Sequence, residues 1–325
     1  MIPPKLNEGD GVRVIAPSTS ARIVSREIMD AAGLKLGRLG LKVSLGNSIN
    51  ILDDFDSSPV DLRLLDIFDA YVDKDVKAIM TVMGGFNSNQ LLKYLDYKLL
   101  RSKPKILCGF SDITALQNAI YKKTGMVTYS GPNFSSLGME NGLEYTIKYF
   151  KECLLSNAPY GIEPSKEWSD DQWYNDQKNR RFVENEGLLV INAGDADGTV
   201  LGGNLRTFNL LQGTEFIPPL KNTILFIEED YESKPVHFDR DLVSLIQQPG
   251  FDEVNGIAIG RFQRGSGMTN ELLYKIIKTK KELEDIPVVA NLDFGHTTPQ
   301  ITFPIGGRAK MYIAKGAAKV DIIEH

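Results

Sequence analysis

Three residue types that can act together as a nucleophile, a base and an acidic partner each follow an apolar segment. They are Ser111 after residues 106–109, Glu228 after residues 223–227, and His296 after residues 288–295. A hydroxyl is a weak nucleophile near neutral pH, so it needs a base, and an imidazole base needs a carboxylate that fixes its tautomer and stabilises its charge. If the fold brings these side chains together, they have the chemistry of a serine hydrolase.

Each of the three residues also has a plainer interpretation. Ser111 or Asp112 can simply cap a helix, because N-cap serines are far more common than nucleophiles. Glu228 can be the first solvated residue after a buried strand, and His296 can be a hydrogen-bonded structural histidine. The order of the residues along the chain leaves these alternatives open.

Neither a metal site nor a cofactor is expected. The chain has three histidines and two cysteines, and no second His or Cys lies at a metal-binding spacing from His296. His237 is expected to be solvated, and His325, the last residue, to be disordered. A nicotinamide-dependent enzyme is disfavoured, because A-P-S-T-S rather than G-x-G-x-x-G follows the first predicted strand.

The stretch 104–125 predicts a strand, a tight turn and a helix, with Ser111 at the turn. The apolar run 106–108 reaches Gly109, and apolar residues then recur at helical spacing from Ile113. Two lysines followed by Gly125 are typical of a helix end. Such a turn lifts a hydroxyl above the sheet edge and aims it at the first free amides of the helix.

Strands and helices alternate along the first half of the chain. The expected strands are 11–17, 41–45, 76–83, 106–109 and 126–130, and the expected helices are 23–39, 59–72, 88–100, 113–124 and 143–155. This alternation predicts a parallel sheet with helices on both faces, in which the working site lies at the carboxyl ends of the strands. Gly84, Gly85 and Ser111 all fall at those ends.

The second half has a different pattern of strands, helices and glycine turns, which predicts a second domain. Its expected strands are 198–205, 223–227, 256–259 and 288–292, with helices over 238–247 and 270–283 and a closing hairpin around 315–316. Between the halves, residues 157–186 show no sustained period and are interpreted as a linker or functional loop. Trp168 and Trp173 in this loop are either packing anchors, which is the favoured interpretation, or a ligand-stacking surface. The predicted domains are 1–156 and 187–325.

Composition excludes several classes of function. The 325 residues are 42% hydrophobic and 24% charged with a net charge of −5, whereas non-specific nucleic-acid binding needs a basic surface. The N-terminal stretch resembles no secretory signal, and no apolar run reaches membrane-spanning length. Two cysteines cannot build a disulfide framework, so we expect a cytoplasmic protein.

Five motifs, taken in order, resemble one family of serine peptidases. They are G-G-F-N-S-N (84–89), G-F-S-D-I-T (109–114), G-G-N-L (202–205), F-I-E-E-D (226–230) and F-G-H-T-T-P (294–299). The family is that of the bacterial LD-carboxypeptidases and microcin C self-immunity proteins. The L-L-K-Y-L-D-Y segment after the first motif and the W-S-D-D insert are most similar to the microcin immunity branch.

The resemblance implies roles for individual residues. Ser111 corresponds to the nucleophile, Glu228 and His296 to the other triad members, and the backbone N–H groups of Gly85 and Asp112 to the oxyanion donors. It implies an α/β fold with an N-terminal parallel-sheet, three-layer domain and a smaller C-terminal α/β domain. The active site would lie in the cleft between them, and the protein would form a homodimer. Asn204, Trp168 and Trp173 are candidate substrate-binding residues.

The resemblance also implies a small substrate, either an aminoacyl-nucleotide conjugate of the microcin C type or a peptide. The alternative activity is removal of the terminal D-alanine from murein tetrapeptides. Microcin immunity proteins carry an aromatic side chain near the end of the insert that stacks on adenine. Residues 185–192 contain no such residue, which leaves Trp168, Trp173 or Tyr174 for that role. A hypothesis of another class is a non-catalytic two-domain protein that binds a small ligand.

Overall fold

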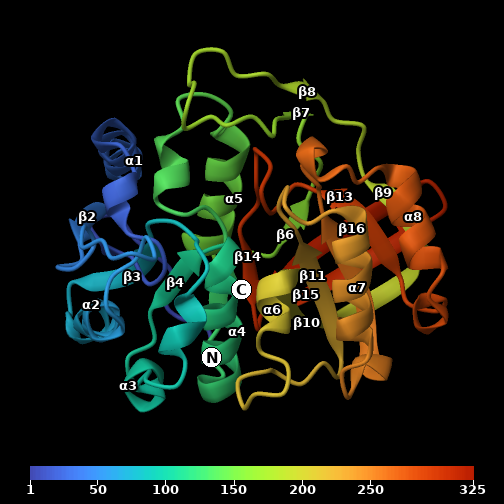
Figure 1. Ribbon diagram of the computed structural model, residues 1–325, viewed down its shortest axis with the longest axis horizontal. Coiled ribbons are helices and arrows are strands. Elements are labelled where there is room, and N and C mark those ends of the chain that lie inside the picture. Colours follow the sequence, from blue (N-terminus) through green and yellow to red (C-terminus); the bar gives the residue numbers. More distant parts are fainter.

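A six-stranded sheet with the order β14-β5-β4-β3-β1-β2 forms the first half of the fold in the computed structural model, which describes residues 1–325 (Figure 1). All neighbouring strands run parallel except the pair β14 and β5. Strands β3 and β4 are almost entirely buried, as expected for a parallel sheet with covered faces. The strands are β1 (Gly11–Ile15), β2 (Lys42–Leu45), β3 (Val76–Thr81), β4 (Ile106–Gly109), β5 (Thr128–Ser130) and β14 (Phe303–Ile305).

The helices of this half divide between the two faces of the sheet. The strand order reverses between β1 and β3, and right-handed crossovers therefore put α1 on one face and α2, α3 and α4 on the other. The contacts agree, because α3 packs against α2 and α4, whereas α1 packs against the 3-10 turn Ser135–Gly138. These helices are α1 (Arg26–Arg38), α2 (Val60–Val72), α3 (Tyr97–Ser102), α4 (Thr114–Thr124) and α5 (Glu144–Leu154).

The helix predicted over residues 88–100 is wrong in its extent. The structure has a 3-10 turn at Ser88–Leu91 and a separate short helix, α3, that begins at Tyr97. Asp96 explains the break, because its side chain accepts hydrogen bonds from the backbone N–H groups of Lys98 and Leu99. This N-cap starts a new helix rather than continuing the earlier turn.

The second half is built on an eight-stranded sheet with the order β6-β16-β15-β10-β11-β12-β13-β9. Its centre, β10 to β13, is parallel, and β15 and β16 form the predicted antiparallel hairpin. The strands are β6 (Tyr160–Ile162), β9 (Leu189–Asn192), β10 (Gly194–Asn204), β11 (Thr223–Glu228), β12 (Val254–Gly260), β13 (Val288–Leu292), β15 (Arg308–Ala314) and β16 (Ala317–Glu324). The helices are α6 (Leu205–Asn209), α7 (Pro235–Ile246) and α8 (Asn270–Lys278).

Three phenylalanines join the two sheets into one hydrophobic core. Phe303 on β14 belongs to the first sheet, and its ring lies 4.9 Å from that of Phe226 on β11 of the second sheet. Phe294 packs against both, at 5.7 Å from Phe226 and 5.1 Å from Phe303. All three are buried, so the apolar contact continues across the boundary between the sheets. The predicted α/β class is confirmed, and the exact domain boundaries stay a prediction.

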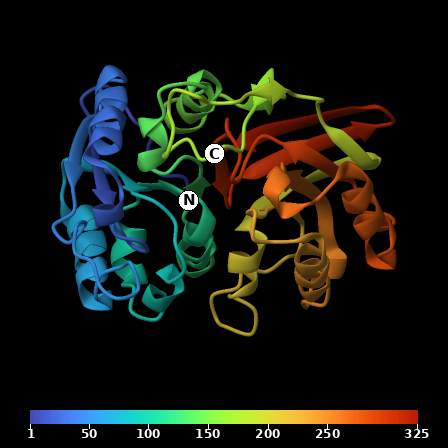
Figure 2. The same cartoon turned by 45° about the horizontal axis from the view of Figure 1, so that its top comes forward.

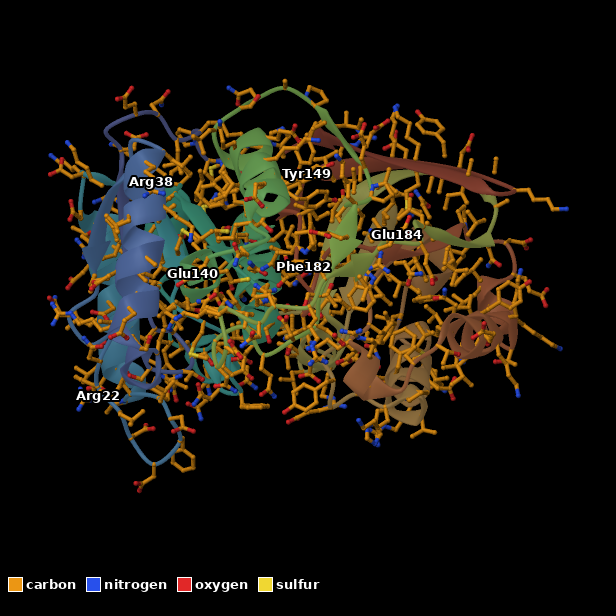
Figure 3. All side chains as sticks on the ribbon, turned by 90° about the horizontal axis from the view of Figure 1, so that it is seen from above. Arg22, Arg38, Glu140, Tyr149, Phe182 and Glu184 are labelled. Atoms are coloured by element: carbon orange, nitrogen blue, oxygen red, sulfur yellow. The ribbon has the colours of Figure 1, made fainter.

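The segment between the halves crosses the top of the molecule in the view of Figure 2. It contains the two-stranded pair β7 (Glu167–Trp168) and β8 (Val183–Glu184). Figure 3 shows Phe182 near the middle of the molecule and Glu184 on the side of the second half. The Phe182 ring fills the space beside Gly142, where an added Cβ would lie 2.4 Å from it. This segment, residues 157–186, is called the insert below. It is packed onto the first half rather than extended as a free linker.

The chain end departs from its prediction. His325 is buried rather than disordered, with Nδ1 2.7 Å from the Lys5 Nζ and 2.9 Å from the Cys153 carbonyl oxygen. Its Nε2 lies 3.0 Å from the Ala158 carbonyl oxygen. These long-range partners, which no local pattern reveals, hold the terminus in place. None of the helices combines the length and the apolar composition needed to span a membrane.

Candidate active site

Ser111 lies in the turn between β4 and α4 with a positive φ of 66°. A non-glycine residue rarely adopts this conformation, and a serine held in it at a strand-to-helix turn is typical of a hydrolase nucleophile. The turn is tight because Gly109 packs against Thr81, where an added Cβ would lie 2.1 Å from the threonine Oγ1. The Ser111 side chain caps neither the 3-10 turn Ser111–Ile113 nor α4.

A continuous chain of hydrogen bonds joins Ser111, His296 and Glu228. The His296 Nε2 lies 3.0 Å from the Ser111 Oγ, and its Nδ1 lies 2.7 Å from the Glu228 Oε2. Ser111 follows β4 in the first sheet, whereas Glu228 ends β11 and His296 follows β13 in the second. Phe110 also contacts the imidazole edge-on, with the rings 5.2 Å apart. The structure thus brings together three side chains from three strand ends.

The charges around His296 raise its pKa above the usual histidine value. Burial alone would lower this pKa, but the charge and hydrogen bond of Glu228 act in the opposite direction and outweigh it. The charge of Asp230 adds to the increase. Burial, followed by the neighbouring Glu228 charge, raises the pKa of Glu229 to about 8. Glu228 is therefore the carboxylate that stabilises a protonated His296, while Glu229 is mainly neutral near pH 7.

Two glycines make room for the Glu228 side chain. Gly295 has a φ of 97°, and an added Cβ there would lie 2.4 Å from the Glu228 Oε2. At Gly260 an added Cβ would lie 2.8 Å from the Glu228 Cβ. The glutamate is buried, and its Oε1 has no hydrogen-bond partner. Its hydrogen bond to His296 thus depends on close backbone approach from two sides.

Two backbone amides next to Ser111 are free to bind an oxyanion. Neither the Gly85 nor the Asp112 N–H donates a hydrogen bond within the protein. Gly84 lets the loop that contains Gly85 lie close to Ser111, since an added Cβ at Gly84 would lie 3.1 Å from the Ser111 Oγ and 3.4 Å from the Asp112 nitrogen. The positive φ of 149° at Gly85 suits a glycine. Free donors at a helix start beside a hydroxyl can stabilise a developing negative charge.

Buried polar contacts hold the loop of Gly84 and Gly85 and the turn at Ser111 in position. The Asp112 Oδ2 accepts hydrogen bonds from the Ser18 Oγ at 2.6 Å and the Ser88 N–H at 2.8 Å. Arg63 donates to the Asn87 side chain at 3.1 Å and to the Pro17 carbonyl oxygen at 3.1 Å. No local sequence pattern reveals these supporting residues, because their partners come from distant segments.

A cavity of about 620 Å³ surrounds Ser111 and is lined by both halves of the chain. It includes Trp173 and Tyr174 from the insert. Trp168 lies elsewhere, with its ring 5.0 Å from the Arg261 guanidinium and 5.2 Å from that of Arg264, as expected for a packing anchor.

The structure places Asn204 at the start of α6. It is buried, and its Oδ1 accepts a hydrogen bond from the Thr207 N–H at 3.1 Å, so that it caps α6. It does not line the cavity around Ser111. No group of three or more His, Cys, Asp or Glu side chains is arranged to hold a metal ion.

Two family models match the chain. The model described as the LD-carboxypeptidase N-terminal domain matches residues 12–131, and the model of the LD-carboxypeptidase C-terminal domain matches residues 197–311. The first range contains Ser111, and the second contains Glu228 and His296. Together they span most of the chain.

Relatives of similar length match this chain over nearly its whole length. The protein named "Putative carboxypeptidase YocD" of Bacillus subtilis is 52% identical over 99% of both chains. A second B. subtilis protein, named "Probable murein peptide carboxypeptidase", is 30% identical over 98% of this chain and 94% of its own. The microcin C7 self-immunity protein MccF of Escherichia coli is 29% identical over 92% of this chain and 89% of its own.

Solved structures share the fold. The crystal structure of an MccF-like protein from Bacillus anthracis superimposes with a TM-score of 0.99 at 52% identity and covers 100% of both chains. MccF in complex with aspartyl sulfamoyl adenosine superimposes with a TM-score of 0.89 at 27% identity, covering 100% of this chain and 99% of that one. The relative arrangement of the two halves is therefore shared with these proteins.

Proposed function

This chain belongs to the LD-carboxypeptidase family of peptidases, and we propose that it is a serine hydrolase that cleaves an amide bond through Ser111, His296 and Glu228. The observation that carries the proposal is the hydrogen-bonded chain from the Ser111 Oγ through the His296 ring to Glu228, at 3.0 and 2.7 Å. The strained backbone at Ser111 and the two free amides beside it support the same assignment.

The reaction follows from these contacts. His296 Nε2 takes the proton of Ser111 as the Oγ attacks the amide carbonyl carbon, and the N–H groups of Gly85 and Asp112 bind the resulting oxyanion. His296 then gives its proton to the leaving nitrogen, and the C–N bond breaks to leave an acyl-serine. Water, deprotonated by His296, attacks this ester and releases the acid. Glu228 orients the imidazole and stabilises its positive charge throughout.

The proposed substrate is a small aminoacyl-nucleotide conjugate. A solved relative holds aspartyl sulfamoyl adenosine, and Trp173 and Tyr174 supply aromatic rings to the cavity around Ser111. An aromatic ring can stack on a nucleobase, because every base has a π-face. These two residues come from the middle of the insert, before residues 185–192, which contain no aromatic side chain.

The murein activity is a second candidate. It is favoured by the 30% identity to a protein named as a murein peptide carboxypeptidase, which extends over nearly the whole of both chains. Incubation of the purified protein with aspartyl sulfamoyl adenosine and, separately, with a murein tetrapeptide, followed by mass analysis of the products, distinguishes the two. Release of free aspartate supports the first substrate, and release of D-alanine supports the second.

Ser111→Ala tests the mechanism itself. The variant should fold normally and lose turnover, whereas Ser102→Ala, an exposed serine in α3, should keep full activity. Full activity of Ser111→Ala would refute the mechanism. A phosphonylating serine reagent separates the hydrolase from a non-catalytic binding protein, because a hydrolase should be labelled at Ser111 and a binding protein should be inert.

We further propose that the enzyme works as a homodimer in the cytoplasm, as its resemblance to the family implies. Light scattering on the purified protein measures the mass directly. A mass near 36.1 kDa, that of one chain, would contradict the dimer.

A further inference from the structure

The cavity around Ser111 contains several carboxylates and no lysine or arginine. The lining carboxylates are Asp56, Asp170, Asp171 and Asp230. A site built to hold a carboxylate or phosphate directly against the scissile bond usually offers a cation. The charge of this lining therefore points to the opposite kind of ligand group, provided that at least one carboxylate is free to bind it.

Two of the four carboxylates are already neutralised by arginines outside the lining. Asp170 accepts a hydrogen bond from the Arg264 Nε at 2.8 Å and also from the Arg264 backbone N–H. Asp171 accepts from the Arg180 Nε at 2.6 Å. These pairs hold the insert in place, and they leave little charge for a ligand.

Asp230 is free and rigidly held. Its Oδ1 accepts hydrogen bonds from the backbone N–H groups of Glu232 at 2.9 Å and Ser233 at 3.3 Å, which fixes the side chain in a tight turn. It makes no ion pair, and its other oxygen has no partner in the protein. Asp230 is half-buried, follows Glu228 by two residues, and lines the same cavity as Ser111 and His296.

Asp56 is the other unpaired carboxylate, but its position is less suitable. It is exposed on a loop of the first half. The charge of Asp230 raises the pKa of His296, and Asp56 is not among the groups that do so. Asp230 is thus the free carboxylate that is both half-buried and able to act on His296.

We propose that Asp230 is a specificity-determining residue that binds a positively charged amino group of the substrate next to the scissile amide. The inference rests on the proposed hydrolase function and names the substrate class as amides whose acyl group carries a free amine. A fixed carboxylate in a half-buried cavity attracts such an ammonium group more strongly than it would in bulk water. It repels a substrate carboxylate in the same position.

The test compares two substrates that differ in this charge. Alanyl sulfamoyl adenosine carries a free amino group, and its N-acetyl derivative does not. A charge-assisted hydrogen bond predicts that kcat/KM for the free amine exceeds that for the acetylated form by about ten- to a hundredfold. In Asp230→Asn this ratio should fall toward one. Because both substrates react through the same His296, an effect of the mutation on His296 cancels in the ratio.

Asp56→Asn is the matched control. It removes another cavity carboxylate at a position with a φ of 56°, which asparagine tolerates, and it should keep the wild-type ratio. Asn at position 230 retains a side-chain oxygen for the two backbone hydrogen bonds, and Asp230→Ser provides a second neutral variant. A ratio that persists in both neutral variants reflects the bulk of the acetyl group and overturns the proposal.

Binding measurements separate this proposal from the hydrolase mechanism. Calorimetry on Ser111→Ala and on Ser111→Ala/Asp230→Asn gives the affinity for both compounds without turnover. Hydrolysis of both compounds by the wild-type enzyme at equal rates would leave the mechanism standing and overturn the role of Asp230. No hydrolysis of either compound, together with a preference for the amine that depends on Asp230, would overturn the mechanism and support the role of Asp230.

Discussion

The Asn118 side chain on α4 makes two hydrogen bonds to the backbone of Gly202 on β10. Its Nδ2 donates to the Gly202 carbonyl oxygen at 2.7 Å, and its Oδ1 accepts from the Gly202 N–H at 3.3 Å. Helix α4 begins at Thr114, after the 3-10 turn that contains Ser111. Strand β10 is the parallel neighbour of β11, with Asn204 in register with Glu228. This contact therefore ties the helix that follows Ser111 to the strand that lies beside β11, which ends at Glu228.

Asn118→Ala should reduce both stability and activity. The mutation leaves the Gly202 N–H and carbonyl group unpaired in a buried position, at a cost of about 1–3 kcal/mol for each group. Activity should fall further than stability explains, because Ser111 is no longer held at hydrogen-bond distance from His296. Urea unfolding and kcat/KM measure the two effects. Asn179→Ala, an exposed asparagine with only local contacts, is the control. Wild-type kcat/KM in a folded Asn118→Ala protein would contradict the positioning role.

Gly295→Ala should disable the enzyme by displacing Glu228. The new Cβ would lie 2.4 Å from the Glu228 Oε2, the oxygen that pairs with His296. Loss of that contact should lower kcat by about a thousandfold or more, as expected when the acidic partner no longer orients the imidazole. Gly316→Ala has a similar φ of 82° with nothing within 4 Å of its Cβ, so it separates backbone strain from the clash. Equal activities of the two variants would argue against the clash.

The pH profile of kcat/KM should report His296. The reaction needs the neutral imidazole, and the pKa of His296 is raised above 6.5, mainly because Glu228 offsets the effect of burial. Activity should therefore rise with pH and level off above a pKa higher than 6.5. In Glu228→Gln the residual activity should level off at a lower pH, because burial then dominates and lowers the pKa. An unchanged midpoint in Glu228→Gln would exclude Glu228 as the cause.

Glu229→Gln should change how stability depends on pH. The pKa of Glu229 is about 8 in the folded protein, against 4.5 for an ordinary glutamate, since burial and the Glu228 charge disfavour its ionised form. The folded state holds the proton more tightly than the unfolded state. The contribution of Glu229 to stability is therefore full below pH 4.5, falls as the pH rises, and is lost above about pH 8. Urea unfolding of both proteins from pH 5 to pH 8 should show a flatter decline in Glu229→Gln. Parallel curves would contradict the raised pKa.

The two tryptophans of the insert should respond differently to mutation. Trp173 lines the cavity around Ser111, so Trp173→Ala should raise the KM of an aminoacyl-nucleotide by about tenfold, the equivalent of one stacked base. Trp168 packs against Arg261 and Arg264, so Trp168→Ala should lower stability by about 0.5–2 kcal/mol and leave KM little changed. Steady-state kinetics and thermal unfolding of both variants check this division. The opposite pattern would reverse the two assignments.

Much of the fold follows from short-range sequence patterns. The strand, turn and helix around Ser111, the closing hairpin and the parallel sheet of the first half could all be predicted, because apolar periodicity and turn residues act within a few positions. The break at Asp96 was missed, because a single capping side chain outweighed a continuous helical pattern. Ser111, Glu228 and His296 could be identified as candidate catalytic residues, because each follows an apolar segment that predicts a buried strand.

The amino-acid sequence by itself determined which residue types stand at the strand ends and which local turn holds Ser111. Only the tertiary structure decided which of them meet: Ser111 and His296 lie 185 positions apart and are joined through Asn118, Phe303 and the packing of two sheets. It also separated Trp173, in the cavity, from Trp168, among arginines, and turned Asn204 into a helix cap. Local patterns record how one segment folds, whereas the partner of a side chain is selected by the packing of the whole chain.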